Sequence, residues 1–391
     1  MLVIGSREFP IRGIHSDVGG IDIYIQNLVK HMQKLGFDYS SYVFSRFVPG
    51  KGLIEHLSNR IKIIHTPFVR FRLLRLIVSD FFAFIYSLFM IRQWKINIIH
   101  VHETIAGFFF GIISKIFKIP LVSQIHTFGS YQPEWPKIGR FLLKKTEEIT
   151  IKFADTVILL CTEARNDVIT RYGCPPEKIE VIPSAVDFER FVSVKSTQNS
   201  SVEDKELIIT FVGRLTESKG LHYLIDAIKH LKTSSSELTP FKVIIAGDGP
   251  LKKELGDLIH KSGLTDKISL PGHITAIESL LASTDIFILP SLYEGLPLAL
   301  LEAMASGCAI IGSNAGGIPD IITNSNTGFI VNRGDSRALA ERIKLLLSDK
   351  DLRLKLGKSG REHVRKKFRW VNTTQSISQI YKRIYFSKMN Q

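Results

Sequence analysis

The sequence has few cysteines and no long apolar run, and each shortage excludes a class of protein. Its 391 residues include three cysteines, Cys161, Cys174 and Cys308, without the paired spacing of a zinc site or a disulfide framework. An odd, unpaired set of thiols indicates a reducing compartment. The chain opens on four apolar residues followed by Arg7 and Glu8, which predicts a first strand and not a signal peptide.

Acidic residues are also in short supply, because the net charge is +14. Residues 1–140 carry 17 Lys and Arg against 8 Asp and Glu, a surplus of nine. Such a surplus is typical of proteins that bind nucleic acid, anionic lipid or an anionic substrate. Nucleic acid is the weakest of the three, because no helix-turn-helix, zinc-finger or RNP-like pattern accompanies the charge.

The longest apolar run, Leu76–Ile91, has sixteen residues and contains Asp80, so it is shorter than the ~20 residues that span a bilayer. We predict a buried helix of the first domain there. Arginines 70, 72 and 75 precede the run among large apolar residues, and Arg92, Trp94 and Lys95 follow it. Basic residues interleaved with apolar ones suit a segment in the lipid headgroup layer, so we also expect peripheral binding to an anionic membrane surface.

One stretch, residues 285–320, organises the rest of the chain. An apolar strand is predicted at Ile286–Leu289, a loop carries Glu294 and Gly295, and an apolar helix follows at about Pro297–Ser306. Glu302 is the only charge in that helix, and a buried carboxylate needs a partner. Two acids at the carboxyl end of a parallel strand lie where open α/β sheets bind ligands, and carboxylates accept hydrogen bonds from vicinal diols. The alternative is an acid bonded to a backbone amide and a second acid in solvent.

Three further segments predict ligand contacts. Arg214 and Lys219 flank a turn before a helix, which suits a diphosphate, although two solvated loop cations would give the same pattern. A Gly19-Gly20 pair precedes a helix near the N-terminus, where backbone can approach a ligand. His126 follows the predicted strand Leu121–Ile125, at the carboxyl tip of a strand where a ligand-facing side chain belongs.

The spacing Glu294-x7-Glu302, the GGIPD segment ending at Asp320, and the GRL-x-x-x-KG segment from Gly213 together resemble the donor site of family-4 retaining glycosyltransferases of the GT-B fold. The resemblance covers nearly the whole chain. It implies an α/β protein with two Rossmann-like parallel-sheet domains facing one cleft. We expect an acceptor-side domain at 1–195, a linker at 196–205, a nucleotide-sugar domain at 206–370, and a helix at 371–391 that returns to the first domain.

The resemblance also implies roles for single residues. Glu302 would hold the ribose and Glu294 the donor sugar, while Arg214, Lys219 and the amides of Gly295 and Leu296 would stabilise the diphosphate. His126 would orient sugar and acceptor, so that the expected catalytic residues are His126, Arg214, Lys219 and Glu294. The remaining expected donor contacts come from loop backbone and lie at Gly19, Gly20, Gly213, Gly247, Gly249 and His273.

Two places depart from the family pattern. Ser184-Ala185 replaces an Asn-Gly turn, which puts fine donor contacts there in doubt, and Asn97 stands where Asp is usual. His100 and His102 follow on the same strand, and we interpret both as structural, with ring nitrogens satisfied near the strand end. The one DxD sequence, Asp349-Lys350-Asp351, is interpreted as solvated surface between helices.

The predicted activity is transfer of a hexose-type sugar from a nucleoside diphosphate, UDP as first candidate, to an acceptor hydroxyl with retention. The family is thought to use front-face attack, which needs no protein nucleophile, and no metal or other cofactor is expected. The implied partners are a nucleotide sugar and a saccharide or lipid-linked acceptor, in cell-surface polysaccharide or glycolipid synthesis at the cytoplasmic face of the membrane. A sugar-nucleotide epimerase of the same fold and a non-catalytic binding subunit remain as alternatives.

Overall fold

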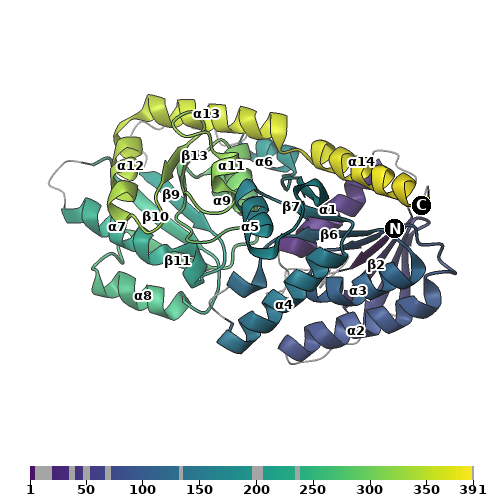
Figure 1. The fold of residues 1–391 in the computed structure, drawn as a ribbon. Coiled ribbons are helices and arrows are strands. Elements are labelled where there is room, and N and C mark those ends of the chain that lie inside the picture. The colour runs from purple at the N-terminus through teal and green to yellow at the C-terminus, as the bar shows by residue number, and fades with distance from the viewer. Residues whose placement is uncertain are drawn as a thin grey trace. The chain divides into compact units, whose positions relative to one another are not determined.

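The computed structural model describes residues 1–4, 20–34, 40–46, 53–66, 72–131, 135–195, 206–233 and 238–389. These residues form two compact units. Unit 1 comprises residues 1–184 and the C-terminal segment 370–391, and unit 2 comprises residues 185–369. Each unit has its own mostly parallel sheet (Figure 1).

Unit 1 contains an eight-stranded sheet with the order β3-β4-β2-β1-β5-β6-β7-β8, parallel except for β3 at one edge. The strands are β1 (Leu2–Ile4), β2 (Ser41–Arg46), β3 (Ile54–Ser58), β4 (Ile61–Thr66), β5 (Ile99–Val101), β6 (Leu121–Ile125), β7 (Thr156–Leu159) and β8 (Ile179–Val181). The helices are α1 (Gly20–Lys34), α2 (Arg72–Met90), α3 (Thr104–Phe117), α4 (Lys137–Phe153), α5 (Thr162–Tyr172) and α14 (Trp370–Met389), with short 3₁₀ turns η1 (Gly129–Tyr131) and η2 (Pro176–Lys178).

Side chains of β5 alternate between the two faces of this sheet, as a strand's must. Ile99 and Val101 pack into an apolar cluster with Phe110 of α3, while His100 points to the other face and meets Tyr381 of α14. The C-terminal helix is therefore part of unit 1, which joins the two ends of the chain in one core.

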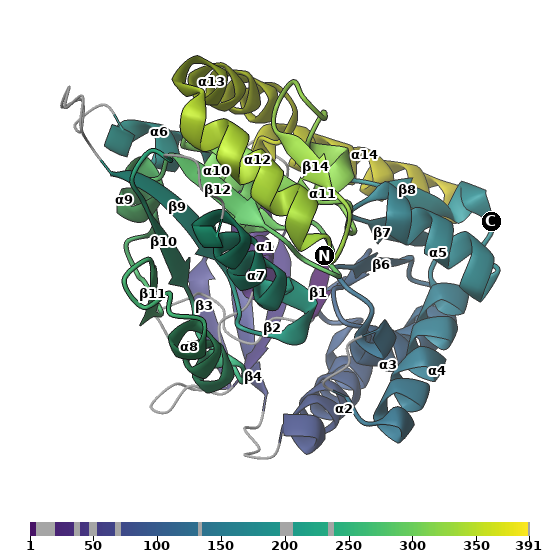
Figure 2. The same ribbon diagram turned by 90° about the vertical axis from the view of Figure 1, so that its left-hand side faces the viewer.

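Helices α2, α3 and α4 lie in a row along one face of this sheet (Figure 1, Figure 2). The apolar run forms the predicted helix, α2, and Ala83 is buried against the sheet. Its outer side keeps Phe81, Ile85 and Phe89 exposed, by 51%, 39% and 77%. The helix is thus half core and half apolar surface. No helix within the described ranges is long and apolar enough to span a membrane.

Unit 2 contains a six-stranded parallel sheet with the order β11-β10-β9-β12-β13-β14. Its strands are β9 (Leu207–Val212), β10 (Phe241–Ala246), β11 (Ile268–Gly272), β12 (Ile286–Leu289), β13 (Ala309–Ser313) and β14 (Phe329–Val331). Its helices are α6 (Phe188–Lys195), η3 (Glu217–Lys219), α7 (Leu221–Thr233), α8 (Lys252–Lys261), α9 (Ile277–Ala282), α10 (Leu298–Ala305), α11 (Ile318–Ile321), α12 (Ser336–Ser348) and α13 (Lys350–Lys367).

The contacts divide the chain after Ser184, earlier than the domain end expected at residue 195. The reason is helix α6, which the sequence did not predict and which packs against α9 and α10 of unit 2. The expected linker at 196–205 lies outside the described residues. Asp349 of the DxD sequence caps helix α13, where its carboxylate accepts a hydrogen bond of 2.8 Å from the amide of Leu352.

Candidate active site

In unit 2 the carboxyl ends of β9 and β12 carry two loops that are hydrogen-bonded to each other. The carbonyl of Ser218 accepts hydrogen bonds from the amides of Leu292, at 2.8 Å, and Tyr293, at 3.2 Å. These bonds place the segment that ends in Lys219 beside the segment that contains Glu294. The two motifs, 75 residues apart in sequence, form one site at the sheet edge where open α/β folds bind ligands.

Lys219 and Glu294 form an ion pair at the centre of this site. The Lys219 Nζ atom donates to Glu294 Oε1 at 2.5 Å, and the hydroxyl of Ser291 donates to the same oxygen at 2.7 Å. The Glu294 side chain is 7% exposed and that of Lys219 21% exposed. Lys219 is thus not a solvated loop cation and Glu294 is not a solvated acid. The carboxylate is held in one orientation by two donors.

The GGIPD segment supports the loop that carries Glu294. Gly316 has φ +53°, and a Cβ at that position would lie 2.0 Å from the carbonyl oxygen of Glu294, so only glycine fits. The next amide, of Gly317, donates to the carbonyl of Gly295 at 2.7 Å. No described residue accepts a hydrogen bond from the amides of Gly295 or Leu296. Both amides precede helix α10, whose positive end favours anions.

The remaining loop glycines serve mainly to bring backbone segments together. Gly247 has φ +145°, and a Cβ there would lie 1.8 Å from the carbonyl oxygen of Gly213. Gly249 meets the carbonyl of Leu215 in the same way, at 2.5 Å. Arg214 leaves this packed turn as an exposed side chain, and none of the described carboxylates pairs with it. His273, after β11, is also exposed.

Glu302 lies in helix α10 and is half-buried. Its charged neighbours, Arg190 and Glu278, were not among the residues that the sequence pointed to. The pKa of its carboxyl is raised to about 7, mainly by burial; the nearby Arg190 of α6 opposes this rise and Glu278 of α9 adds to it. Arg190 pairs with Glu278 through its Nε atom. The residues that the structure describes offer no hydrogen bond to the Glu302 carboxyl. A carboxyl with this pKa is partly protonated near neutral pH, when it can both donate to and accept from a diol.

In unit 1 His126 follows β6 and His102 follows β5, so both lie at the carboxyl edge of the sheet. The Nδ1 atom of His102 and the Nε2 atom of His126 are 3.1 Å apart, within hydrogen-bonding distance. His126 is half-buried and His102 is 2% exposed. One ring must donate and the other accept, so this contact orients His126 and couples its tautomer to that of His102.

His100 extends the contact toward the C-terminal helix. Its Nδ1 atom lies 2.5 Å from the hydroxyl of Tyr381, and its ring lies 4.2 Å from that of His102. Burial lowers the pKa of His100 and of His126 to about 3, and that of His102 well below its usual range, so all three imidazoles are neutral. The Nδ1 atoms of His100 and His102 are satisfied as expected for structural histidines, but their Nε2 atoms have no partner in the part of the chain described.

Two aromatic residues complete this neutral group and were not predicted. The ring of Tyr24 lies edge-on to His126 at 4.8 Å and also contacts Trp370 at 5.2 Å. The Tyr24 hydroxyl is buried beside the Gln124 amide, but neither group makes a hydrogen bond of good geometry in the part of the chain described. Their positions in α1, β6 and α14 gave no signal, because nothing in the sequence shows that those elements meet. Gly20 begins α1, and Gly19 lies outside the described residues.

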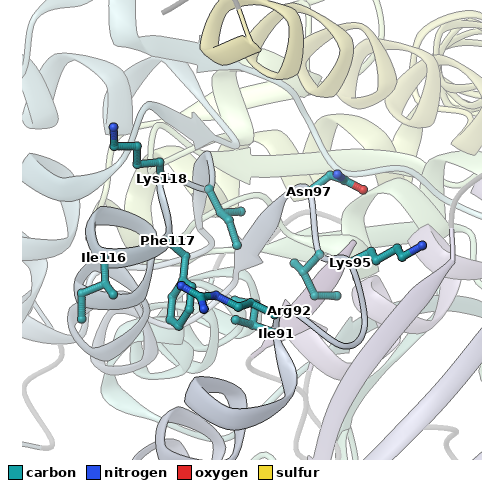
Figure 3. A pocket seen from close by; sticks show the side chains of 9 residues that line it. Ile91, Arg92, Lys95, Asn97, Ile116, Phe117 and Lys118 are labelled. Atoms are coloured by element: carbon teal, nitrogen blue, oxygen red, sulfur yellow. The ribbon is translucent and has the colours of Figure 1, made fainter.

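A hollow of about 340 Å³ lies at the amino edge of the unit 1 sheet, where α2 and α3 end and β5 and β6 begin. Arg92 lies against the ring of Phe117 there, while Lys95 and Lys118 point away from each other (Figure 3). The helix dipole stabilises cations near helix C-termini without a bound anion. The diverging side chains do not form an anion site.

The family models match the chain in two adjacent segments. "Glycosyl transferases group 1" matches residues 194–363, and "Glycosyltransferase Family 4" matches residues 18–190. The chain belongs to these glycosyltransferases. The family transfers a sugar from a nucleotide sugar or related donor.

Curated and solved proteins agree with this assignment. The glycosyltransferase is 28% identical over 315 residues to the Escherichia coli UDP-Gal:alpha-D-GlcNAc-diphosphoundecaprenol alpha-1,3-galactosyltransferase, an alignment that covers 78% of this chain and 80% of that protein. Sucrose-phosphate synthase of Thermosynechococcus elongatus has the same fold, with a TM-score of 0.84, 21% identity and 99% of both chains covered. Anabaena Alr3699/HepE in complex with UDP-glucose has a TM-score of 0.75 at 19% identity, over 97% of this chain and 98% of that one. The predicted GT-B fold class is confirmed.

Proposed function

We propose that the glycosyltransferase moves a hexose-type sugar from a nucleoside diphosphate, UDP as first candidate, to an acceptor hydroxyl with retention of configuration. The observation that carries the proposal is the Lys219–Glu294 pair beside the open amides of Gly295 and Leu296. It combines a cation and two N–H donors for a diphosphate with an acid for sugar hydroxyls. UDP is supported by two similar proteins, of which one has UDP-Gal in its name and the other was solved in complex with UDP-glucose.

The chemistry follows from where charge develops. As the bond between the sugar and the diphosphate breaks, negative charge grows on the leaving oxygen, and Arg214, Lys219 and the two amides stabilise it. The leaving oxygen takes the proton of the acceptor hydroxyl as the new glycosidic bond forms on the same face. Glu294 holds donor-sugar hydroxyls, Glu302 the ribose diol, and His126 orients sugar and acceptor. Arg214 and Lys219 supply the positive charge that a metal ion supplies in other enzymes.

A thermal-shift screen tests the donor assignment, because a ligand that binds only the folded protein raises its melting temperature. UDP and a UDP-hexose should raise Tm in wild type and much less in Arg214→Ala. Activity should survive EDTA. A Tm that responds to no nucleotide, or activity that EDTA abolishes and Mn²⁺ restores, would contradict the proposal. Turnover of the donor without an acceptor would favour the epimerase alternative.

The acceptor is proposed to be a saccharide or a lipid-linked saccharide, in polysaccharide or glycolipid synthesis at the cytoplasmic face of the membrane. The acceptor in the name of the E. coli relative is a sugar on a lipid diphosphate. The exposed stripe of Phe81, Ile85 and Phe89 on α2 supports contact with a bilayer, since large exposed apolar patches mark interaction sites. Arg70 and the side chains of Arg72 and Arg75 lie outside the described residues.

Liposome flotation tests the membrane contact. Wild-type protein should float with anionic vesicles at low salt, less at high salt, and less when Phe81 and Phe89 are replaced by Ser. Ile23→Ser, an exposed apolar residue on α1, is the matched control. Protein that stays at the bottom with both neutral and anionic vesicles would leave a soluble acceptor as the working hypothesis.

A further inference from the structure

A hollow of about 400 Å³ lies in unit 1 between η1, α4 and α5. Its charged walls come from two helices. They consist of Lys137, Arg140 and Lys144 of α4 and Arg171 of α5, with the phenol groups of Tyr131 and Tyr172. Four cations around one hollow imply an anionic ligand, and the hollow is large enough for a phosphate or diphosphate.

A buried acid fixes the wall of the hollow. Glu147 of α4 is fully buried and accepts hydrogen bonds from the amide of Ser130 at 3.1 Å, its hydroxyl at 2.6 Å, and the hydroxyl of Tyr172 at 2.7 Å. Three neutral donors satisfy this carboxylate, and no cation of the rim forms an ion pair with it among the residues described. It holds η1, α4 and α5 together around the hollow.

The positions of these cations favour binding of an anionic ligand over stabilisation of the protein fold. Arg171 is held by Asp167 at 3.1 Å and stacks over the ring of Tyr131 at 4.7 Å, which orients its guanidinium. Lys137 and Arg140 pair with no carboxylate among the residues described. Both lie in the first turns of α4, where there is no acid and where cations oppose the helix dipole. Their placement costs helix stability unless an anion binds there.

An apolar strip runs beside the cations on the same helix. Ile138, Phe141 and Leu142 are 77%, 61% and 56% exposed. Residues three and four positions apart share one helix face, so these side chains form a continuous surface next to Lys137, Arg140 and Lys144. A ligand that matches both surfaces has a phosphate head and a hydrocarbon chain.

The hollow is linked to His126 through a short loop. The 3₁₀ turn η1 begins at Gly129, three residues after His126, and its Tyr131 lines the hollow. The ring of Phe128, within that loop, stacks on Tyr172 at 5.7 Å. A ligand in the hollow is therefore held by the segment that positions the residue expected to orient the acceptor.

We infer that this hollow is the subsite for the diphosphate of a lipid-linked acceptor, with its lipid chain lying along Ile138, Phe141 and Leu142. This inference rests on the proposed function, because only that function makes the bound ligand an acceptor. The binding of a lipid diphosphate can nevertheless be measured without turnover. No covalent step takes place at the subsite, which holds the acceptor while its sugar hydroxyl reacts elsewhere.

Calorimetry with farnesyl diphosphate, at a monomeric concentration and with UDP saturating any donor site, tests the subsite. Farnesyl diphosphate should bind wild type at least ten-fold more tightly than farnesol or inorganic pyrophosphate. Arg140→Gln with Lys144→Gln should weaken it at least ten-fold and leave UDP binding unchanged. Ile138→Ser with Phe141→Ser should reduce it to the level of pyrophosphate.

The control is Lys145→Gln with Lys152→Gln, which removes the same charge from other positions of α4. An equal loss in this control would show general attraction to the helix and overturn the subsite, as would unchanged binding in the Arg140 and Lys144 variant. Pyrophosphate binding as tightly as farnesyl diphosphate would overturn the lipid part. The Glu294→Gln variant should bind farnesyl diphosphate normally, so failure of transfer and failure of the subsite are separate results.

Discussion

The carboxyl edges of the two sheets carry opposite kinds of chemistry. In unit 2 the edge presents charge, with Lys219 paired to Glu294, Arg214 exposed and two amides without described acceptors. In unit 1 it presents neutral rings, because burial keeps His126 and His102 unprotonated. A diphosphate leaving group needs positive charge, whereas an acceptor hydroxyl needs orientation. The proposed function would therefore divide these two tasks between the side chains at the strand ends of two similar sheets.

The largest expected effect comes from removing charge at the unit 2 edge. Lys219→Ala and Arg214→Ala should each slow transfer at least ten-fold, since each ten-fold corresponds to only ~1.4 kcal/mol of lost charge stabilisation. Lys219→Ala should also lower Tm, because it leaves the buried Glu294 carboxylate without its cation. Arg214→Ala should leave Tm unchanged. Lys261→Ala, an exposed lysine at the end of α8, is the control for steady-state kinetics and thermal unfolding.

A rate equal to wild type in either variant would remove the diphosphate role. If Tm fell with the rate in Arg214→Ala, the effect would be structural and the contrast between a buried pair and an exposed cation would fail.

The unit 1 edge should affect rate without affecting the nucleotide. His126→Ala should lower kcat about ten-fold and change nucleotide affinity by less than two-fold, because the side chains expected to hold the nucleotide, Arg214, Lys219 and Glu302, lie in unit 2. His102→Gln should cost less, since an amide can still bond the His126 ring that lies 3.1 Å from the native imidazole. Rapid kinetics and calorimetry separate the two quantities. Parallel losses of binding and rate would instead mark His126 as a structural residue.

Replacing Glu302 should affect nucleotide affinity more than turnover, in contrast to replacing Glu294. Glu302→Ala should weaken nucleotide affinity several-fold, whereas Glu294→Ala should mainly reduce turnover. Calorimetry with UDP measures the first and steady-state assays the second. Unchanged nucleotide affinity in the Glu302 variant would remove the ribose assignment, and Glu278→Gln tests whether the neighbouring acid rather than Glu302 carries the effect.

The smallest expected effect is on the pH dependence of stability, to which Glu302 and His126 should contribute with opposite signs. The pKa of Glu302 is raised from 4.5 to about 7 in the folded protein, so its contribution to stability is present below 4.5 and is lost as pH rises through 7. The pKa of His126 is lowered from 6.5 to about 3, so its contribution is present above 6.5 and is lost as pH falls toward 3.

Thermal unfolding of two variants from about pH 3 to about pH 7, the folded-state pKa values of His126 and Glu302, measures this difference. Relative to wild type, Glu302→Gln should gain Tm as pH rises, whereas His126→Gln should gain Tm as pH falls. Parallel slopes would show that neither group titrates as its surroundings indicate. Imidazole NMR signals of His126 should not titrate in the folded protein and should titrate near pH 6.5 in urea.

The elements that carry the unit 2 candidate residues could be predicted from the sequence because they are local patterns. Glu294 and Glu302 share one strand–turn–helix unit, and Gly316 lies in the next turn, where only glycine fits. Strand periodicity and turn chemistry act over a few residues, so the order of strand, loop and helix was correct there. Helix α10 begins at Leu298, one residue later than predicted, because Pro297 keeps an extended ψ.

Only the tertiary structure decided how the neutral histidines of unit 1 meet and which charged residues surround Glu302. The contact between His100 and Tyr381 joins residues 281 positions apart, and Arg190 reaches Glu302 only because α6 packs on α10. The sequence determined which faces of these elements are apolar, and so that they would be buried. It did not determine which buried polar groups would meet. That depends on the order of strands in the sheet and on where α14 returns, and burial then sets the pKa of each group.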